Sequence, residues 1–143
     1  MKYVYRNISG VTAVSLIQGV NIGNSSSKAS DLITVHKCRI ANTYSSSITV
    51  DVYIQAIDQR ATIKLYGPDS DVDITKEYYY IKDLVIPTGT AVNVFGDIAC
   101  TYSREYSLKV QLETSNDTAD IAVSYETIAG TTPASRQREI NQY

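Results

Sequence analysis

The stretch ITVDVYIQA, residues 48–56, decides the fold, because apolar residues occupy every second position of it. Successive side chains of a β-strand point to opposite faces of a sheet, so this stretch is predicted to be a strand with one dry and one wet face. Tyr53 falls on the wet face. The alternation recurs at 106–113, with Ser107 on the wet side, and at 120–126. The residues expected in the core are therefore Ile48, Val50, Val52, Leu108, Val110, Ile121 and Val123.

Further segments rich in β-branched and aromatic residues are predicted to be strands. They are 11–22, 32–41, 61–66, 77–86 and 91–95, and short turns rich in Gly, Pro, Asn and Ser separate them. No segment of the sequence repeats apolar residues at helical spacing. Strands that are dry on one face only argue against a parallel α/β sheet. The sequence thus predicts an all-β protein, an antiparallel β-sandwich of jelly-roll or immunoglobulin-like type.

The strand pattern stops near residue 128, so we expect a sandwich domain at 1–128 and a separate segment at 129–143. That segment is either a disordered tail, which is common at chain ends, or an extended C-terminal arm that orders against a neighbouring subunit. In the second case Ile140 and Tyr143 would be its apolar anchors.

Composition excludes several classes of function. The net charge is −2, and the charges are scattered with no basic stripe, so nucleic acid is not expected as a partner. No apolar run approaches the roughly 20 residues that span a bilayer, so no membrane association is expected. The first residues lack the apolar region of a signal peptide. We therefore expect synthesis in a cytoplasm without signal-peptide secretion.

Catalytic and metal-binding patterns are weak. The single histidine, His36, would have to serve any Ser-His-Asp or Cys-His site, and no Gly-x-Ser-x-Gly elbow is present. His36 lies two residues before Cys38, so a strand is expected to place both on one face. Cys100 would complete a three-ligand metal site, but this spacing fits no zinc pattern. Buried free thiols or a disulfide between neighbouring strands both remain open for the cysteines. We predict no enzyme, no cofactor and no metal.

The acidic run at 69–73 places carboxylates at alternate positions, as the start of an EF-hand loop does. Ile74 and Tyr80 then stand where that loop needs glycine and glutamate. A solvated turn is the expectation, and a weak calcium site is the alternative.

Tyrosine dominates the aromatic residues, with twelve Tyr against one Phe and no Trp. Its ring and hydroxyl suit protein interfaces, although β-proteins also favour tyrosine in their sheets. Within 78–80 the middle residue must face away from its neighbours, which are as well explained by core packing. The predicted subunit-interface residues are Tyr3, Tyr5, Tyr79, Arg136, Arg138, Ile140 and Tyr143.

Several strand-and-turn motifs lie in one order along residues 1–126. They are Tyr3-Val4-Tyr5-Arg6-Asn7, Ile40-Ala41-Asn42 before a Ser/Thr-rich turn, Ile48-Thr49-Val50-Asp51-Val52, Tyr80-Ile81-Lys82-Asp83, Ile86-Pro87-Thr88-Gly89-Thr90, Ser107-Leu108-Lys109-Val110 and Val123-Ser124-Tyr125-Glu126. This order resembles a recurring β-sandwich domain of virion structural proteins from tailed phages, including marine and cyanobacterial ones. Members often carry Gly-Asp before the Ser-Leu-Lys-Val strand, where this chain has Arg104-Glu105-Tyr106, so its local turn is expected to differ.

The resemblance implies a non-enzymatic structural protein of the virion, assembled in the host cytoplasm. The first expectation is a capsid decoration or cement protein that bridges neighbours, with other phage structural proteins and its own copies as partners. A neck, collar or tail protein is the alternative location. A glycan-binding or host-surface adhesion module is the alternative of another class, and the absence of Trp argues against it.

Overall fold

The computed structural model describes the backbone of residues 1–20, 31–56, 60–63, 70–73 and 77–129, and the side chains of these ranges except 60–63 and 70–73. The described strands are β1 (Lys2–Ser9), β2 (Val14–Ile17), β3 (Leu32–Asn42), β4 (Ile48–Ala56), β5 (Arg60–Ile63), β6 (Ser70–Asp73), β7 (Glu77–Ile86), β8 (Ala91–Asn93), β9 (Cys100–Ser103), β10 (Tyr106–Leu112) and β11 (Thr118–Ile128).

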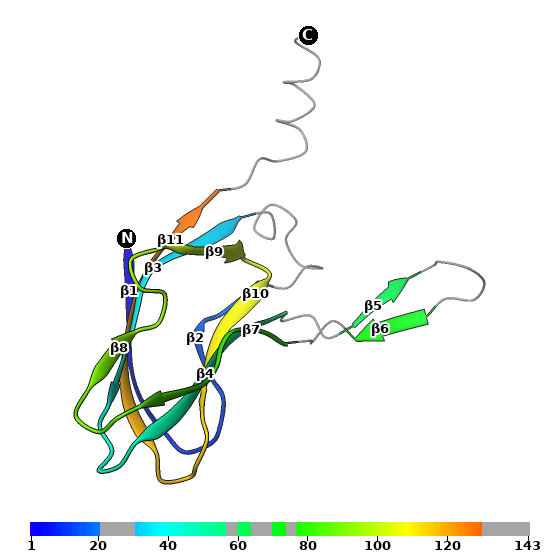
Figure 1. Cartoon of the computed structure of the whole chain (residues 1–143). Helices are drawn as coiled ribbons and strands as arrows, with labels where there is room; N and C mark the ends of the chain where they lie inside the picture. Colours follow the sequence, from blue (N-terminus) through cyan, green and yellow to red (C-terminus); the bar gives the residue numbers. More distant parts are fainter. Residues whose placement is uncertain (21–30, 57–59, 64–69, 74–76, 130–143) are drawn as a thin grey trace.

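Two antiparallel sheets pack face to face (Figure 1). Sheet A has the order β1-β11-β3-β8, and β9 also pairs with β3. Sheet B has the order β2-β10-β4-β7. All pairings are antiparallel, and they confirm the predicted β-sandwich.

A separate two-stranded ribbon, β5–β6, projects from the body between β4 and β7 in the chain (Figure 1). Its register places Arg60 opposite Asp73 and Ile63 opposite Ser70. Residues 70–73 of the acidic run are thus a strand and not the expected turn. The calcium alternative depends on Asp69 and on side chains that lie outside the described ones.

The core lies between the two sheets and confirms the prediction from period-two alternation. Its seven predicted members are all buried, and Val35, Ile40, Val50, Val52, Leu108 and Val110 are inaccessible to solvent. Each alternating strand directs one row of β-branched or leucine side chains into this layer, where close packing and the removal of apolar surface from water stabilise the fold.

Two residues predicted on wet faces are buried instead. Tyr53 is only 2% exposed, because the ring of Tyr79 from the neighbouring strand covers it at a centroid distance of 5.1 Å. Ser107 is also 2% exposed, and its hydroxyl accepts a hydrogen bond from the Gly19 backbone N–H at 2.9 Å. In both cases a contact from a sequence-distant segment closes the outer face, which alternation within one strand does not reveal.

The predicted common face for His36 and Cys38 is wrong, because β3 carries a bulge between them. The pairing of β11 with β3 shifts register between Ser124 and Tyr125 and leaves His36 without an opposite residue. Such an extra residue interrupts the alternation of faces. Cys38 consequently enters the core, whereas His36 Nε2 lies 2.6 Å from Glu126 Oε1 in a partly exposed pair.

Asn42 ends β3 and fixes the turn that follows. It is 5% exposed, and its side-chain amide donates to the carbonyl oxygens of Ser46 and Ile86, both at 2.8 Å. Its carbonyl oxygen accepts from the Tyr44 N–H at 2.7 Å. An asparagine can satisfy both directions at once, which explains this residue at the end of the Ile40-Ala41-Asn42 motif.

Candidate interaction surface

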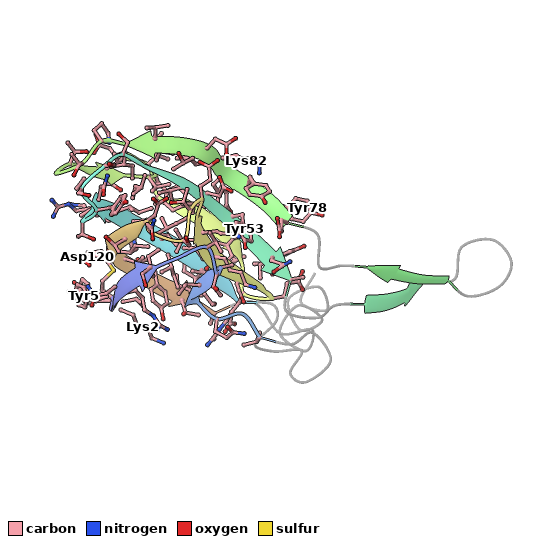
Figure 2. All side chains as sticks on the ribbon, turned by 90° about the horizontal axis from the view of Figure 1, so that it is seen from below. Lys2, Tyr5, Tyr53, Tyr78, Lys82 and Asp120 are labelled. Carbon is pink, nitrogen blue, oxygen red and sulfur yellow. The ribbon has the colours of Figure 1, made fainter. Side chains whose placement is uncertain are left out.

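A shallow groove of about 360 Å³ lies on the outer face of sheet A. We call it the sheet A groove, and its lining consists of Tyr5, Arg6, Asn7, Arg39, Ala41, Asp120, Ile121 and Ala122. Figure 2 shows Tyr5 and Asp120 on one side of the sandwich, with Tyr53 and Lys82 on the other.

The strand register builds this groove. Ala122 of β11 lies opposite Tyr5 on one side and opposite Arg39 on the other. In the next row Asp120 lies between Asn7 and Ala41. Directly opposed residues of antiparallel strands share a face, so the small side chain of Ala122 forms a floor between Tyr5 and Arg39. The tyrosine wall is β1, and the cationic wall is β3.

The groove is open to solvent and is lined by both polar and apolar side chains. Tyr3 is 63% and Tyr5 is 74% exposed, which is unusual for rings that lie side by side along one strand. The Asn7 amide donates to Asp120 Oδ1 at 2.5 Å, which holds the carboxylate at the groove end. Arg39 makes no ion pair with the residues that the structure describes. Tyrosine and arginine, together with tryptophan, are enriched among the residues that dominate the binding energy of protein–protein interfaces.

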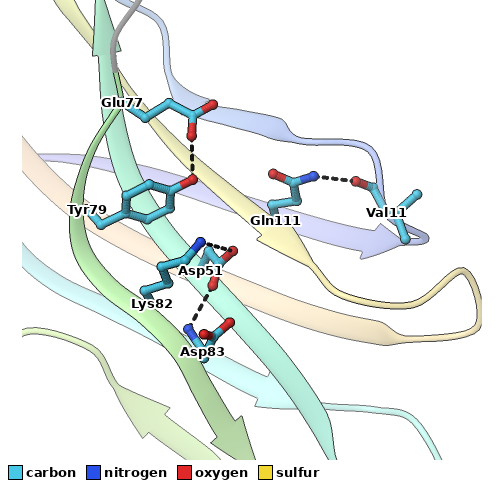
Figure 3. A network of polar contacts seen from close by, with 7 residues as sticks. All are labelled: Val11, Asp51, Glu77, Tyr79, Lys82, Asp83 and Gln111. Atoms are coloured by element: carbon cyan, nitrogen blue, oxygen red, sulfur yellow. Dashed lines mark hydrogen bonds and ion pairs between the residues drawn. The ribbon is translucent and has the colours of Figure 1, made fainter.

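Tyr79 on sheet B is engaged in local contacts (Figure 3). Its hydroxyl donates to a Glu77 carboxylate oxygen, and this hydrogen bond raises the pKa of Tyr79 to about 12. Lys82 Nζ lies 4.4 Å from its ring centroid and 3.9 Å from Asp51 Oδ2. The structure therefore places this predicted interface residue over Tyr53, far from Tyr3 and Tyr5.

The two other tyrosines of the 78–80 triplet lie at the rim of the sandwich and are partly exposed. Tyr78 packs edge-on against Tyr106 at 6.0 Å, and Tyr80 packs edge-on against Phe95 at 5.4 Å. Both pack against an aromatic ring at the surface, but neither enters the core, so the core-packing alternative for these two residues is wrong.

The chemistry-bearing residues do not converge in the part of the chain that the structure describes. No group of three metal-ligating side chains occurs there. Cys38 and Cys100 are both free thiols, and burial raises the pKa of Cys38 to about 12, so its reactive thiolate is strongly disfavoured. The described residues also include no helix that is long and apolar enough to cross a membrane.

The sequence pointed to only part of this surface. Tyr5 lines the groove and Tyr3 lies beside it on the same strand, whereas Arg136, Arg138, Ile140 and Tyr143 lie outside the described residues. Asn7, Arg39 and Asp120 were missed. In the sequence each of them is only a polar residue within a strand, as Arg39 is between the buried Cys38 and Ile40. Which of these residues lie next to one another follows only from the register of β1, β11 and β3.

Comparisons with known proteins add little to this geometry. Neither protein-family models nor curated protein sequences match the chain. Among solved structures, the chain is similar to a protein of the Bacillus endospore appendages, which are described as a novel family of disulfide-linked pili. The TM-score is 0.45 at 11% identity, covering 91% of this chain and 87% of the other. A likeness of this size says nothing about function.

Proposed function

We propose that this chain is a non-enzymatic structural component of a tailed-phage virion, most specifically a capsid decoration protein that bridges neighbouring subunits. The observation that carries the proposal is the exposed pair Tyr3 and Tyr5 across a small-residue floor from Arg39. The resemblance of the strand motifs supplies the setting. The partners are other virion proteins and further copies of the chain.

The fold suits such a role because the anchoring side chains stand on strands. A rigid sheet holds Tyr5 and Arg39 at fixed spacing, so docking orders few groups and loses little conformational entropy. Individually weak contacts repeated over many copies on one particle add through avidity. A bridging protein therefore needs a presented face more than a deep pocket.

Occupancy on particles tests the proposal. Purified chain is added to particles of the encoding phage that were prepared without it, and bound copies are counted by quantitative mass spectrometry. The double variant Tyr5→Ala/Arg39→Ala is expected to lose most of the occupancy. Ile98→Ala, at an exposed apolar residue outside the groove, is expected to retain it. Full occupancy of the double variant, or no binding by the unmodified chain, rejects the proposal.

The copy number also distinguishes the two locations. A count matching the capsid lattice supports decoration, whereas a count matching a neck, collar or tail ring supports the alternative location. A particle reconstruction then shows which neighbours the chain contacts.

A glycan- or host-surface-binding module is the second candidate, favoured by the composition of the same groove. An exposed aromatic ring, Tyr5, lies near an amide, a carboxylate and a guanidinium, and these groups together suit a sugar ring and its hydroxyls. Micromolar binding on a glycan array that is lost in Arg39→Ala supports this candidate. A blank array with full binding to particles removes it.

A further inference from the structure

Strand β1 is an edge strand of unusual regularity. It pairs with β11 residue by residue from Lys2 to Ser9 without a register shift. No other described strand pairs with its outer side. The backbone N–H and C=O groups along that side are therefore available to another strand, which is the situation that most proteins prevent.

The other described edges carry protection. β7 has two register shifts against β4 and a left-handed residue, Asp83, with φ 59°. The N–H of Asp83 is already bonded to Asp51 Oδ1 at 2.8 Å. β2 covers only Val14–Ile17 and is bulged against β10. β8 and β9 are short and lie at opposite ends of β3. β1 has neither a bulge nor a proline.

Three registers in which a second copy of β1 could pair with this edge have their two-fold axis at Val4, Tyr5 or Arg6, and they differ in the charges that they oppose. Two antiparallel strands related by a two-fold axis place one residue opposite itself, and opposed residues share a face. An axis at Val4 opposes Lys2 to Arg6 and shortens the pairing, and an axis at Arg6 opposes two arginines. An axis at Tyr5 avoids both like-charge pairs. It pairs Lys2 with Ile8, Tyr3 with Asn7, Val4 with Arg6, and Tyr5 with itself.

We propose that two copies of this chain associate through antiparallel β1–β1 pairing about a two-fold axis at Tyr5. Sheet A then continues across the two copies, and the two sheet A grooves form one symmetric face with the paired Tyr5 rings at its centre. The inference deepens the proposed function and rests on it for the role of this face in assembly. The pairing itself is a property of the purified chain.

Cysteine cross-linking reads the register directly. In a Cys100→Ser background, where Cys38 is buried, Tyr5→Cys places two thiols opposite each other at a Cα separation that a disulfide spans. Tyr3→Cys is the matched control on the same face, because its two copies are offset by four residues, about 13 Å. Copper-phenanthroline oxidation is expected to cross-link the first variant and not the second. The pair Tyr3→Cys/Asn7→Cys is expected to cross-link again.

Sedimentation equilibrium supplies the second measurement. Tyr5→Lys removes the central aromatic pair and opposes two ammonium groups, so the dimer dissociation constant is expected to rise about tenfold. Ile98→Lys adds the same charge away from β1 and is expected to leave it unchanged. A monomeric unmodified chain, or cross-linking stronger at Tyr3→Cys than at Tyr5→Cys, overturns the inference. A dimer that does not bind particles rejects the proposed function and leaves the pairing intact.

Discussion

Replacing Asn42 with alanine tests how the turn after β3 is held. The side chain is nearly fully buried and makes three hydrogen bonds, to the carbonyl oxygens of Ser46 and Ile86 and to the N–H of Tyr44. Alanine removes all three and cannot offer a substitute. The Ile86 carbonyl belongs to a residue with no solvent exposure, so water cannot readily replace the lost donor.

The expected cost follows from these contacts. A protein hydrogen bond contributes about 1 kcal/mol net, so the three together are worth about 3 kcal/mol. For a domain of this size each kcal/mol shifts the melting temperature by about 3 °C, which gives a decrease of about 9 °C. Thr43→Ala is the matched control in the same turn. It removes one exposed hydrogen bond, to the Thr118 hydroxyl, and should cost less than about 1 kcal/mol.

Urea unfolding followed by circular dichroism measures both variants. Equal m-values show that the compared states are the same, so that midpoint shifts report stability. If Asn42→Ala unfolds within about 1 kcal/mol of the unmodified protein, the turn does not depend on these three hydrogen bonds and the prediction is wrong. An equal loss of unfolding free energy in Asn42→Ala and Thr43→Ala also contradicts the prediction.

Three further predictions concern other parts of the sandwich. Burial raises the pKa of Cys38, so iodoacetamide at pH 8 should label Cys38 only after unfolding. Mass spectrometry of quenched samples measures the labelling, and a rate equal to that of the half-buried Cys100 contradicts the prediction. The pKa of Tyr79 is about 12 against an ordinary value near 10, because its protonated hydroxyl donates to Glu77. The contribution of Tyr79 to stability is thus complete below about pH 10 and is lost as the pH rises toward 12. Tyr79→Phe should therefore make the free energy of unfolding less dependent on pH in this range. It should also remove one late step from the titration of tyrosine absorbance at about 295 nm. Gly19→Ala should cost about 1–3 kcal/mol by chemical denaturation, because the added methyl carbon would lie 2.7 Å from a backbone carbon of β10; an unchanged midpoint shows that this approach is not tight.

Alternation in the sequence correctly predicts the strands that bury one face in the core and leave the other face toward solvent. The 48–56 stretch becomes β4 with the expected ends, and its apolar row is buried as expected. Patterning fails where the chain departs from strict period two. The bulge at His36 and the burial of Tyr53 under Tyr79 both depend on the partner strand. β9 was missed because Cys100–Ser103 carries no alternating run.

The sequence predicted an interface that uses tyrosines, but not where on the sandwich the groove would lie. The sequence singled out Tyr3 and Tyr5 as interface residues, although its alternation did not predict the strand β1 that carries them. Nothing within β1 indicates that Ala122 will lie beside Tyr5 and that Arg39 will lie beyond it. Three strands in register create this groove, and the residues that face each other across it, such as Asp120 and Ala41, are far apart in the sequence.

The pairing of β1 with β11 sets how the protein responds to mechanical load. Lys2 lies opposite Tyr125, so the start of the first strand and the end of the last strand meet at one end of sheet A. Tension applied at these two points peels the strands apart and breaks their hydrogen bonds one after another, whereas shear along the strands would load all of them together. The β1–β11 pair is therefore expected to yield more easily when it is pulled apart at Lys2 and Tyr125 than when it is sheared along its length.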